Sequence, residues 1–153
     1  MKFNFIIVLF ALLGGCNRGA TVSINDYKFS VEVADTDQTR QQGLMYRESM
    51  ANNAGMLFIF PRQRIQAFWM ENTLIPLDII YFDKNLKLVS IQKNRQPCRL
   101  PDRTSAALKG LIYTPCPSYT SEKPAKYVLE INAGLADKYH FKQGDELLLM
   151  LKK

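Results

Sequence analysis

The sequence is poor in the residues on which most hydrolases and metalloenzymes depend. Its 153 residues include one histidine, His140, and no Gly-x-Ser-x-Gly elbow, glycine-rich phosphate loop, His-Glu-x-x-His pair or EF-hand loop. His140 ends a predicted short helix, whose dipole is reason enough for an imidazole there, and no nucleophile or orienting acid is marked beside it. The six methionines form no Met-x-x-Met cluster of the kind that binds Cu(I). We therefore predict no catalytic residue, no metal site and no cofactor.

The composition excludes several further classes of protein. With 47% apolar and 22% charged residues, and with no internal repeat or low-complexity segment, the chain is neither disordered, nor collagen-like, nor a coiled coil. The long apolar run at residues 3–13 has eleven residues, fewer than the roughly 20 that cross a bilayer as a helix. The length of the remainder suits one domain with its own core.

The first residues have the pattern of an export signal. Lys2 gives a basic start, the apolar run follows, and a Leu-Gly-Gly triplet precedes Cys16. Leu-Gly-Gly-Cys resembles the lipobox of bacterial lipoproteins, in which the cysteine is lipidated and becomes the new N-terminus. We expect a lipoprotein signal peptide at 1–15, the lipidated Cys16 and a short tether at 16–26, and a single β domain at 27–153. The alternatives are a plain signal peptide with an incidental Cys16, or a buried first strand.

Cysteine use agrees with a protein that is anchored to a membrane and faces the periplasm or the cell exterior. After Cys16, only Cys98 and Cys116 remain, with 17 residues between them. Outside the cytoplasm such a pair is expected to be oxidised. A redox pair or two metal thiolates are the alternatives, but redox motifs usually place two residues between the cysteines and thiolate metal sites need more ligands. We predict a structural disulfide.

Basic residues are concentrated in one stretch of the chain. Residues 84–126 hold nine Lys or Arg against Asp102 and Glu122. The export signal and the lack of a groove-reading motif argue against nucleic acid as a partner. The excess predicts a solvated basic face, or contact with anionic lipid headgroups or acidic envelope polymers. The sequence does not indicate an oligomeric state.

Short alternating segments predict a mainly β fold. Strands are expected at 27–34, 55–60 (ended by Pro61), 66–70, 77–82, 86–91, 127–132 and 146–151. A helix of about nine residues should follow Asp35 or Thr36 and end near Gly43, and a second should span 133–140. Seven or eight short strands with two short helices indicate a β sandwich or barrel, and the lack of β-α-β alternation argues against a nucleotide-binding parallel sheet.

Blocks spread over most of the chain carry a family resemblance. They include residues 43–49 (GLMYRES), 55–60 (GMLFIF), 68–80 (FWMENTLIPLDII) and 127–134 (YVLEINAG). Over residues 27–151 the sequence resembles the domain of unknown function 192 family, a prokaryotic and often exported family. The resemblance implies a compact, jelly-roll-like β sandwich and no established activity.

Residues 68–73 form the first candidate binding segment. They contain Trp69, the only tryptophan, with Met70, Asn72 and Thr73 close behind. An aromatic platform beside amide and hydroxyl groups suits a sugar or a small polar ligand. Alternatively, Trp69 is a core residue, and Asn72 and Thr73 close the following turn through local hydrogen bonds.

Acidic residues within the family blocks form the second candidate. Glu130 alternates with apolar residues in a predicted strand, so it lies either on a wet face or inside with a partner, for which Arg47 is plausible. Hydrolysis of a glycosidic bond needs only two carboxyl groups, about 5 to 9 Å apart. The four candidate acids are Glu48, Glu71, Asp78 and Glu130.

Three hypotheses of function follow. The first is a membrane-tethered, non-catalytic binding module for a saccharide, a cell-wall polymer or a protein partner. The second is a carboxylate-dependent hydrolase acting on an envelope polymer. The third is an envelope assembly or stabilising factor that recognises a partner through an exposed apolar patch.

Overall fold

The computed structural model describes residues 19–98 and 115–151 of the chain. Cys16, the expected signal peptide and most of the loop between Cys98 and Cys116 lie outside the described residues. None of the described helices is long and apolar enough to cross a membrane.

The described residues form nine strands and two short helices. In chain order they are β1 (Gly19–Ile24), β2 (Tyr27–Ala34), α1 (Asp37–Gln42), β3 (Ala54–Arg64), β4 (Ala67–Phe68), β5 (Leu77–Phe82), β6 (Leu88–Arg95), β7 (Tyr119–Thr120), β8 (Ala125–Asn132), α2 (Leu135–Lys138) and β9 (Leu147–Leu151). The predicted mainly β fold is therefore confirmed.

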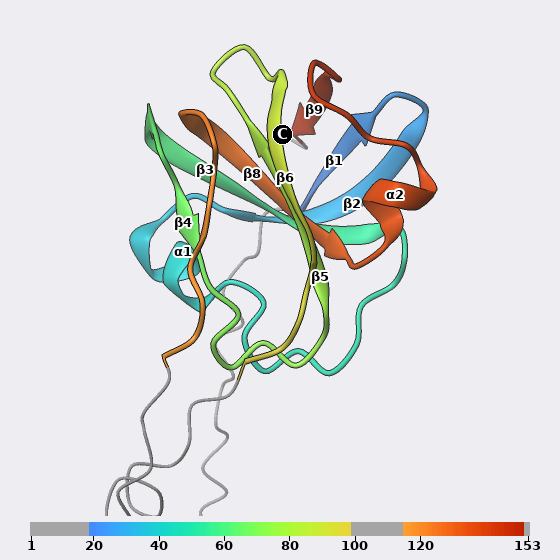
Figure 1. The fold of residues 1–153 in the computed structure, drawn as a ribbon. Coiled ribbons are helices and arrows are strands. Elements are labelled where there is room, and N and C mark those ends of the chain that lie inside the picture. The colour runs from blue at the N-terminus through green and yellow to red at the C-terminus, as the bar shows by residue number, and fades with distance from the viewer. Residues whose placement is uncertain (1–18, 99–114, 152–153) are drawn as a thin grey trace, which may run out of the picture.

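Seven of the strands form one curled sheet in the order β6-β5-β8-β3-β2-β1-β9, and β4 pairs with β7 in a small second sheet (Figure 1). The large sheet curls so strongly that the residues just before its two edge strands form a single bridge, between Lys87 and Glu146, although β6 and β9 themselves do not pair. Its neighbours are antiparallel except β2 and β3, which run parallel with α1 in the connection between them. The fold is a half-barrel rather than a flat sandwich.

Strict alternation divides the apolar residues of the sheet between two cores. One face carries Phe29, Leu57, Ile80 and Leu129 toward a cluster that α2 helps to close. The opposite face carries Met56, Phe58, Tyr81 and Val128, and the loop after α1 and the small sheet cover it. The candidate site lies on this second face.

Several boundaries differ from those that the sequence predicts. β1 lies in the range 16–26 expected to be tether, because a six-residue strand that ends in a two-residue turn is a weak pattern. Pro61 does not end β3: the register shifts between Ile59 and Arg64, and such a bulge tolerates a residue without an N–H. α2 has only four residues, and β7 was not predicted.

The predicted disulfide between Cys98 and Cys116 is present, with the two Cα atoms 5.8 Å apart. Cys98 is hydrogen-bonded to the segment that follows β4. Its N–H donates to the Met70 carbonyl, and its carbonyl accepts from the Asn72 N–H. The bridge therefore ties Cys116 to the segment that carries Trp69.

We expect the double variant Cys98→Ala/Cys116→Ala to lose about 3 kcal/mol of unfolding free energy. Without the bridge the unfolded chain gains conformational entropy, and for a loop of this length that gain lowers its free energy by about this amount. Urea unfolding followed by far-ultraviolet circular dichroism measures the change. Reduced wild-type protein is the control and should match the double variant. A variant as stable as the oxidised protein would show that the bridge adds no stability.

Candidate functional site

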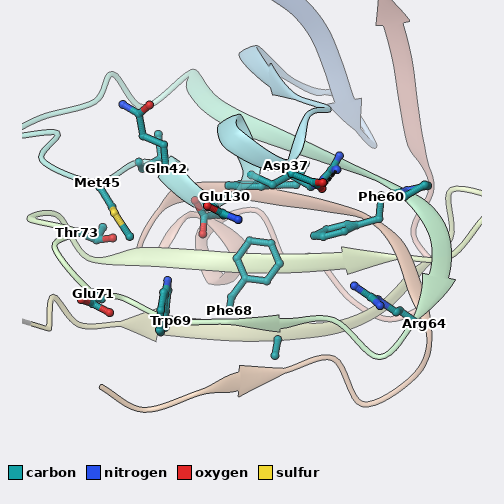
Figure 2. A pocket seen from close by; sticks show the side chains of 17 residues that line it. Asp37, Gln42, Met45, Phe60, Arg64, Phe68, Trp69, Glu71, Thr73 and Glu130 are labelled. Carbon is teal, nitrogen blue, oxygen red and sulfur yellow. Dashed lines mark hydrogen bonds and ion pairs between the residues drawn. The ribbon is translucent and has the colours of Figure 1, made fainter. Parts of the chain in front are cut away.

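A pocket of about 350 Å³ opens on the second face of the sheet, between α1, β3 and the segment that contains β4 (Figure 2). Phe58, Phe60, Phe68 and Trp69 supply its aromatic walls. Its charged lining residues are Asp37, Arg40, Arg64, Glu71 and Glu130. A concave, largely apolar space with a few polar groups is the usual form of a small-molecule site.

Helix α1 forms one wall because its N-terminus is firmly fixed. Thr36 accepts a hydrogen bond from the Thr39 N–H, and the Thr39 hydroxyl accepts one from the Thr36 N–H, which is a reciprocal capping box. Arg40 then reaches across to β3, donating to the Asp35 and Ile59 carbonyls. Since Arg40 also pairs with Asp37 at 2.6 Å, its charge is largely committed to holding the wall.

The aromatic walls are built around Phe68. Its ring meets Phe58 edge-on at 4.9 Å between centroids and Phe60 at 6.1 Å. Phe68 projects from β4 into the middle of the space in Figure 2. Trp69 follows it and is 55% exposed, so its indole stands at the pocket entrance rather than in the core.

Glu130 lies on β8 and is only 4% exposed, yet it lines the pocket. Its strand neighbours are Met56 on β3 and Ile79 on β5, both buried apolar residues. Gly55 permits the close approach of β3 to β8 here, since a Cβ at that position would lie 2.5 Å from the Glu130 carbonyl oxygen. No group of the described residues donates a hydrogen bond to the Glu130 carboxyl or pairs with it.

Burial raises the pKa of Glu130 from 4.5 to about 8. The empty pocket therefore presents mainly a neutral carboxylic acid at pH 7, which can donate one hydrogen bond. Burial also raises the pKa of Tyr81 above its usual range, with the Glu130 charge acting in the same direction and Arg95 opposing it. The Tyr81 hydroxyl remains a donor and hydrogen-bonds the Tyr119 carbonyl at 2.8 Å.

The segment 68–73 is divided between pocket and core. Trp69 and Thr73 line the pocket, as the binding interpretation requires. Met70 is fully buried in the second core, and Asn72 is in a left-handed turn where its backbone bonds Tyr46 and Cys98. The Asn72 bonds are long-range backbone bonds rather than the local turn bonds of the alternative interpretation. The core interpretation of Trp69 is wrong, since the side chain is exposed.

The predicted partnership between Arg47 and Glu130 is wrong. Arg47 pairs with Glu32 at 2.6 Å and does not line the pocket. Glu32, Met56 and Glu130 occupy one cross-strand row, so the salt bridge lies two strands away from Glu130. Glu130 is thus not on a wet face and has no partner among the described residues; burial raises its pKa to about 8, so the carboxyl is mainly neutral at pH 7.

The four candidate acids do not share one cleft. Asp78 points to the opposite side, where its two oxygens accept from the Asn94 and Ala136 N–H groups at 2.7 and 2.8 Å. Glu48 is exposed and outside the pocket. Glu71 and Glu130 both line it. Elsewhere in the described residues, no group of three or more His, Cys, Asp or Glu could hold a metal ion, and His140 is exposed beyond α2.

Sequence reasoning missed the α1 wall, Phe58, Phe60 and Arg64. Phe58 and Phe60 read as ordinary strand residues, because a side chain that faces a pocket and one that faces a core share the same alternation. Arg64 gives no local signal at all. Only the register of β3 places it beside β8, where it pairs with Ala125.

Comparison with known proteins identifies the family of this chain. The domain of unknown function 192 family, described as "Uncharacterized ACR", matches residues 20–149. A crystal structure from Sinorhizobium meliloti described as a "putative transcription regulator" is 30% identical, with a TM-score of 0.73, over 87% of this chain and 95% of that one. A Novosphingobium aromaticivorans protein of unknown function is also 30% identical, with a TM-score of 0.69, over 85% and 83% of the two chains. No protein of curated function matches. This chain belongs to the domain of unknown function 192 family.

Proposed function

We propose that the protein is a non-catalytic binding module, tethered through Cys16 on the outer side of a cell membrane, and that its pocket takes one small group of an envelope constituent. The observation that carries the proposal is Glu130, a buried carboxyl without a donor in the described part of the chain, which lines a pocket of about 350 Å³. A buried polar group is costly unless it is hydrogen-bonded, so a ligand that supplies the missing partner gains affinity.

The pocket entrance supports the same function. Trp69 is half exposed beside the partly buried Phe68, an arrangement that offers an aromatic face to a ligand before it reaches Glu130. Sugar rings are one class of group that stacks on such a face. The regulatory role named for the Sinorhizobium structure is not carried over, because the expected export signal separates this chain from DNA.

Hydrolysis of an envelope polymer is the second candidate, favoured by Glu71 and Glu130 in one pocket. It requires both carboxyl groups, so Glu71→Gln would abolish turnover of the polymer. Glu48 and Asp78 are excluded as the catalytic acids of such a hydrolase. Glu48 lies outside the pocket, and the Asp78 carboxyl accepts from two backbone N–H groups.

Because Trp69 is the only tryptophan, its fluorescence reports the pocket directly. We expect a saturable change when the full chain, in a polyoxyethylene detergent, is titrated with at least one of four soluble probes. The probes are N-acetylglucosamine, a muramyl dipeptide, glycerophosphoethanolamine and glycerophosphoglycerol.

We predict that Trp69→Ala weakens binding of the active probe by at least about tenfold, since truncation of an aromatic hot-spot residue costs about 2 kcal/mol or more. Isothermal titration calorimetry measures this in the absence of the indole, and thermal unfolding should be unchanged because the ring is half exposed. Tyr46→Ala is the matched control, an aromatic residue that is 67% exposed and outside the pocket lining. No response to any probe, or equal affinity in Trp69→Ala, would contradict the proposed function.

A further inference from the structure

The strand registers connect the pocket to the place where the tether leaves the domain. Gly19, the first residue of β1, pairs with Glu32 on β2, which pairs with Met56 on β3, which pairs with Glu130 on β8. Neighbouring strands lie about 4.8 Å apart, so Glu130 is roughly 14 Å across the sheet from Gly19. One cross-strand row therefore contains both the start of the domain and the buried carboxyl.

Helix α1 and the later part of β3 lie beyond this row, on the side toward which the chain leaves β1. Since β1 and β2 are antiparallel, β1 begins where β2 ends, and α1 follows directly from that end (Figure 1). β3 runs parallel to β2 and places Phe58 beside Ala34. From Cys16 to Gly19 the chain spans at most about 11 Å. A lipid on Cys16 would hold this side of the domain against the headgroups.

The interior of the pocket has the features of an ammonium site. Glu130 offers carboxyl oxygens without a donor from the described residues, and the rings of Phe58 and Phe68 line the same space. Figure 2 shows the Phe68 ring within it. A cation gains from the faces of aromatic rings and from a carboxylate that is shielded from water. An ammonium group also brings N–H donors, which is what Glu130 lacks.

The rim supplies a complementary charge. Arg64 is exposed and lines the pocket, and its guanidinium has no ion pair within residues 19–98 and 115–151. Arg40, in contrast, is committed to two carbonyls and Asp37. A guanidinium is well suited to a phosphate. The Glu130 carboxyl inside the pocket and the Arg64 guanidinium at its rim complement a short zwitterion whose cation enters the pocket first.

Resting on the binding function proposed above, we propose that the pocket binds the headgroup of an ethanolamine phospholipid of the membrane to which the protein is tethered, with the ammonium on Glu130 and the phosphate at Arg64. The protein would then be held to its membrane twice, once by covalent lipid and once by recognition of a headgroup.

Binding should depend on pH in a characteristic way. The ammonium requires the ionised form of Glu130, so affinity should rise by nearly tenfold per pH unit below pH 8 and level off above it. A neutral sugar whose oxygen accepts a hydrogen bond from the protonated Glu130 would show the reverse. The other titratable or charged groups that face the pocket or Glu130 are Asp37 and Arg40 from α1, Arg64 from β3, Glu71 after β4, and Tyr81 from β5.

The test titrates the full chain with glycerophosphoethanolamine and follows Trp69 fluorescence between pH 6 and pH 8.5. We expect this probe to bind at least about tenfold more tightly than glycerophosphoglycerol, which has no ammonium. Glycerophosphocholine, which keeps the cation but has no N–H donor, should bind at an intermediate affinity. Equal affinity for the glycerol and ethanolamine probes, or affinity that falls as pH rises, would overturn the inference.

Matched variants separate the two ends of the headgroup. Glu130→Gln should lose about tenfold or more in affinity at pH 8 and lose the pH dependence, whereas Glu48→Gln, an exposed acid outside the pocket, should keep both. Arg64→Ala should weaken glycerophosphoethanolamine by about three- to tenfold but leave free ethanolamine unaffected, with the exposed Arg62→Ala as control. If Arg64→Ala weakens both ligands equally, the phosphate does not lie at Arg64.

Reconstitution shows whether the bilayer itself fills the pocket. In vesicles that contain phosphatidylethanolamine, added glycerophosphoethanolamine should leave Trp69 fluorescence unchanged, because headgroups already occupy the site. In vesicles of phosphatidylglycerol alone it should produce the full change. The same change in both vesicles would overturn the inference, as would binding of N-acetylglucosamine without binding of the ethanolamine probe. Binding of N-acetylglucosamine alone would leave the proposed binding function intact. No response to any of the probes would contradict both the binding function and the headgroup inference.

Discussion

Replacement of Glu130 by Gln should make the protein more stable at pH 8.5 than the wild type, by on the order of 4 kcal/mol. Burial raises the pKa of this carboxyl from 4.5 to about 8. Below pH 4.5 the group is protonated in both the folded and the unfolded chain, so its contribution to stability is fully present. As pH rises, the unfolded chain releases its proton first, and the contribution is lost progressively until the folded carboxyl ionises near pH 8.

The measurement is urea unfolding of wild type and Glu130→Gln at half-unit steps from pH 4 to pH 9. The two free energies should nearly coincide at pH 4 and diverge by about 1.4 kcal/mol per pH unit in between, reaching a constant difference above pH 8. Glu48→Gln is the matched control, and its curve should run parallel to the wild type because that carboxyl is exposed. Parallel curves for Glu130→Gln would show that the Glu130 carboxyl is ionised at neutral pH in the folded state.

The unfolding free energy and ligand binding should both depend on the ionisation of Glu130. Ionisation of Glu130 destabilises the fold, and a cation bound beside the carboxylate would offset that loss. A ligand that binds the folded protein alone also raises its stability with concentration. Glycerophosphoethanolamine should therefore stabilise the wild type most at pH 8 and have little effect on Glu130→Gln. The same residue thus connects the unfolding curve with the occupancy of the pocket.

The sequence predicted the elements with a clear pattern and missed those that depend on long-range register. β2 and β5 match their expected residues, and α1 has the expected Thr36 cap and Gly43 end. These features are local, since they follow from alternation or from capping side chains. β7 has two residues and exists only because β4 lies opposite it, so no pattern within it could mark it.

The candidate site shows the same division. Trp69 and Glu130 stand out in sequence, one as the only tryptophan and the other as an acid among apolar residues. Their presence in one pocket depends on β4 lying over the sheet and on the register of β8, neither of which is encoded locally. The partner assigned to Glu130 was wrong for the same reason. Arg47 lies over the correct row of the sheet but faces Glu32, two strands away.

Asp78 illustrates how an acid in a family block can serve structure rather than chemistry. It lies opposite a bulge: Leu77 pairs with Arg95 and Ile79 with Gln92, so two β6 residues stand against one on β5. The extra N–H, that of Asn94, is taken by Asp78 Oδ1. The other oxygen accepts from Ala136 near the start of α2, whose own cap residue, Gly134, has no side chain to do so.

Asp78→Ala should therefore lose about 3 to 5 kcal/mol of unfolding free energy, because it leaves two N–H groups without their charged acceptor, one of them buried. Asp78→Asn should lose about half as much, since an amide oxygen can accept from one of the two while its NH₂ group faces the other. Asp137→Ala, in helix α2, is the control. Its ion pair with Lys93 is exposed, so removal should change stability by less than about 1 kcal/mol.

Hydrogen exchange identifies the mechanism of the loss. In Asp78→Ala the amides of Asn94 and Ala136 should exchange faster than the loss of global stability alone explains, because both lose their acceptor. The amide of Glu130 on β8 should lose protection only by the global amount, since no Asp78 side-chain bond holds it. Ligand binding at the pocket should then persist wherever the variant is folded. Loss of probe binding in folded Asp78→Ala would show instead that the two faces of the sheet are coupled, and that Asp78 supports the site through β5.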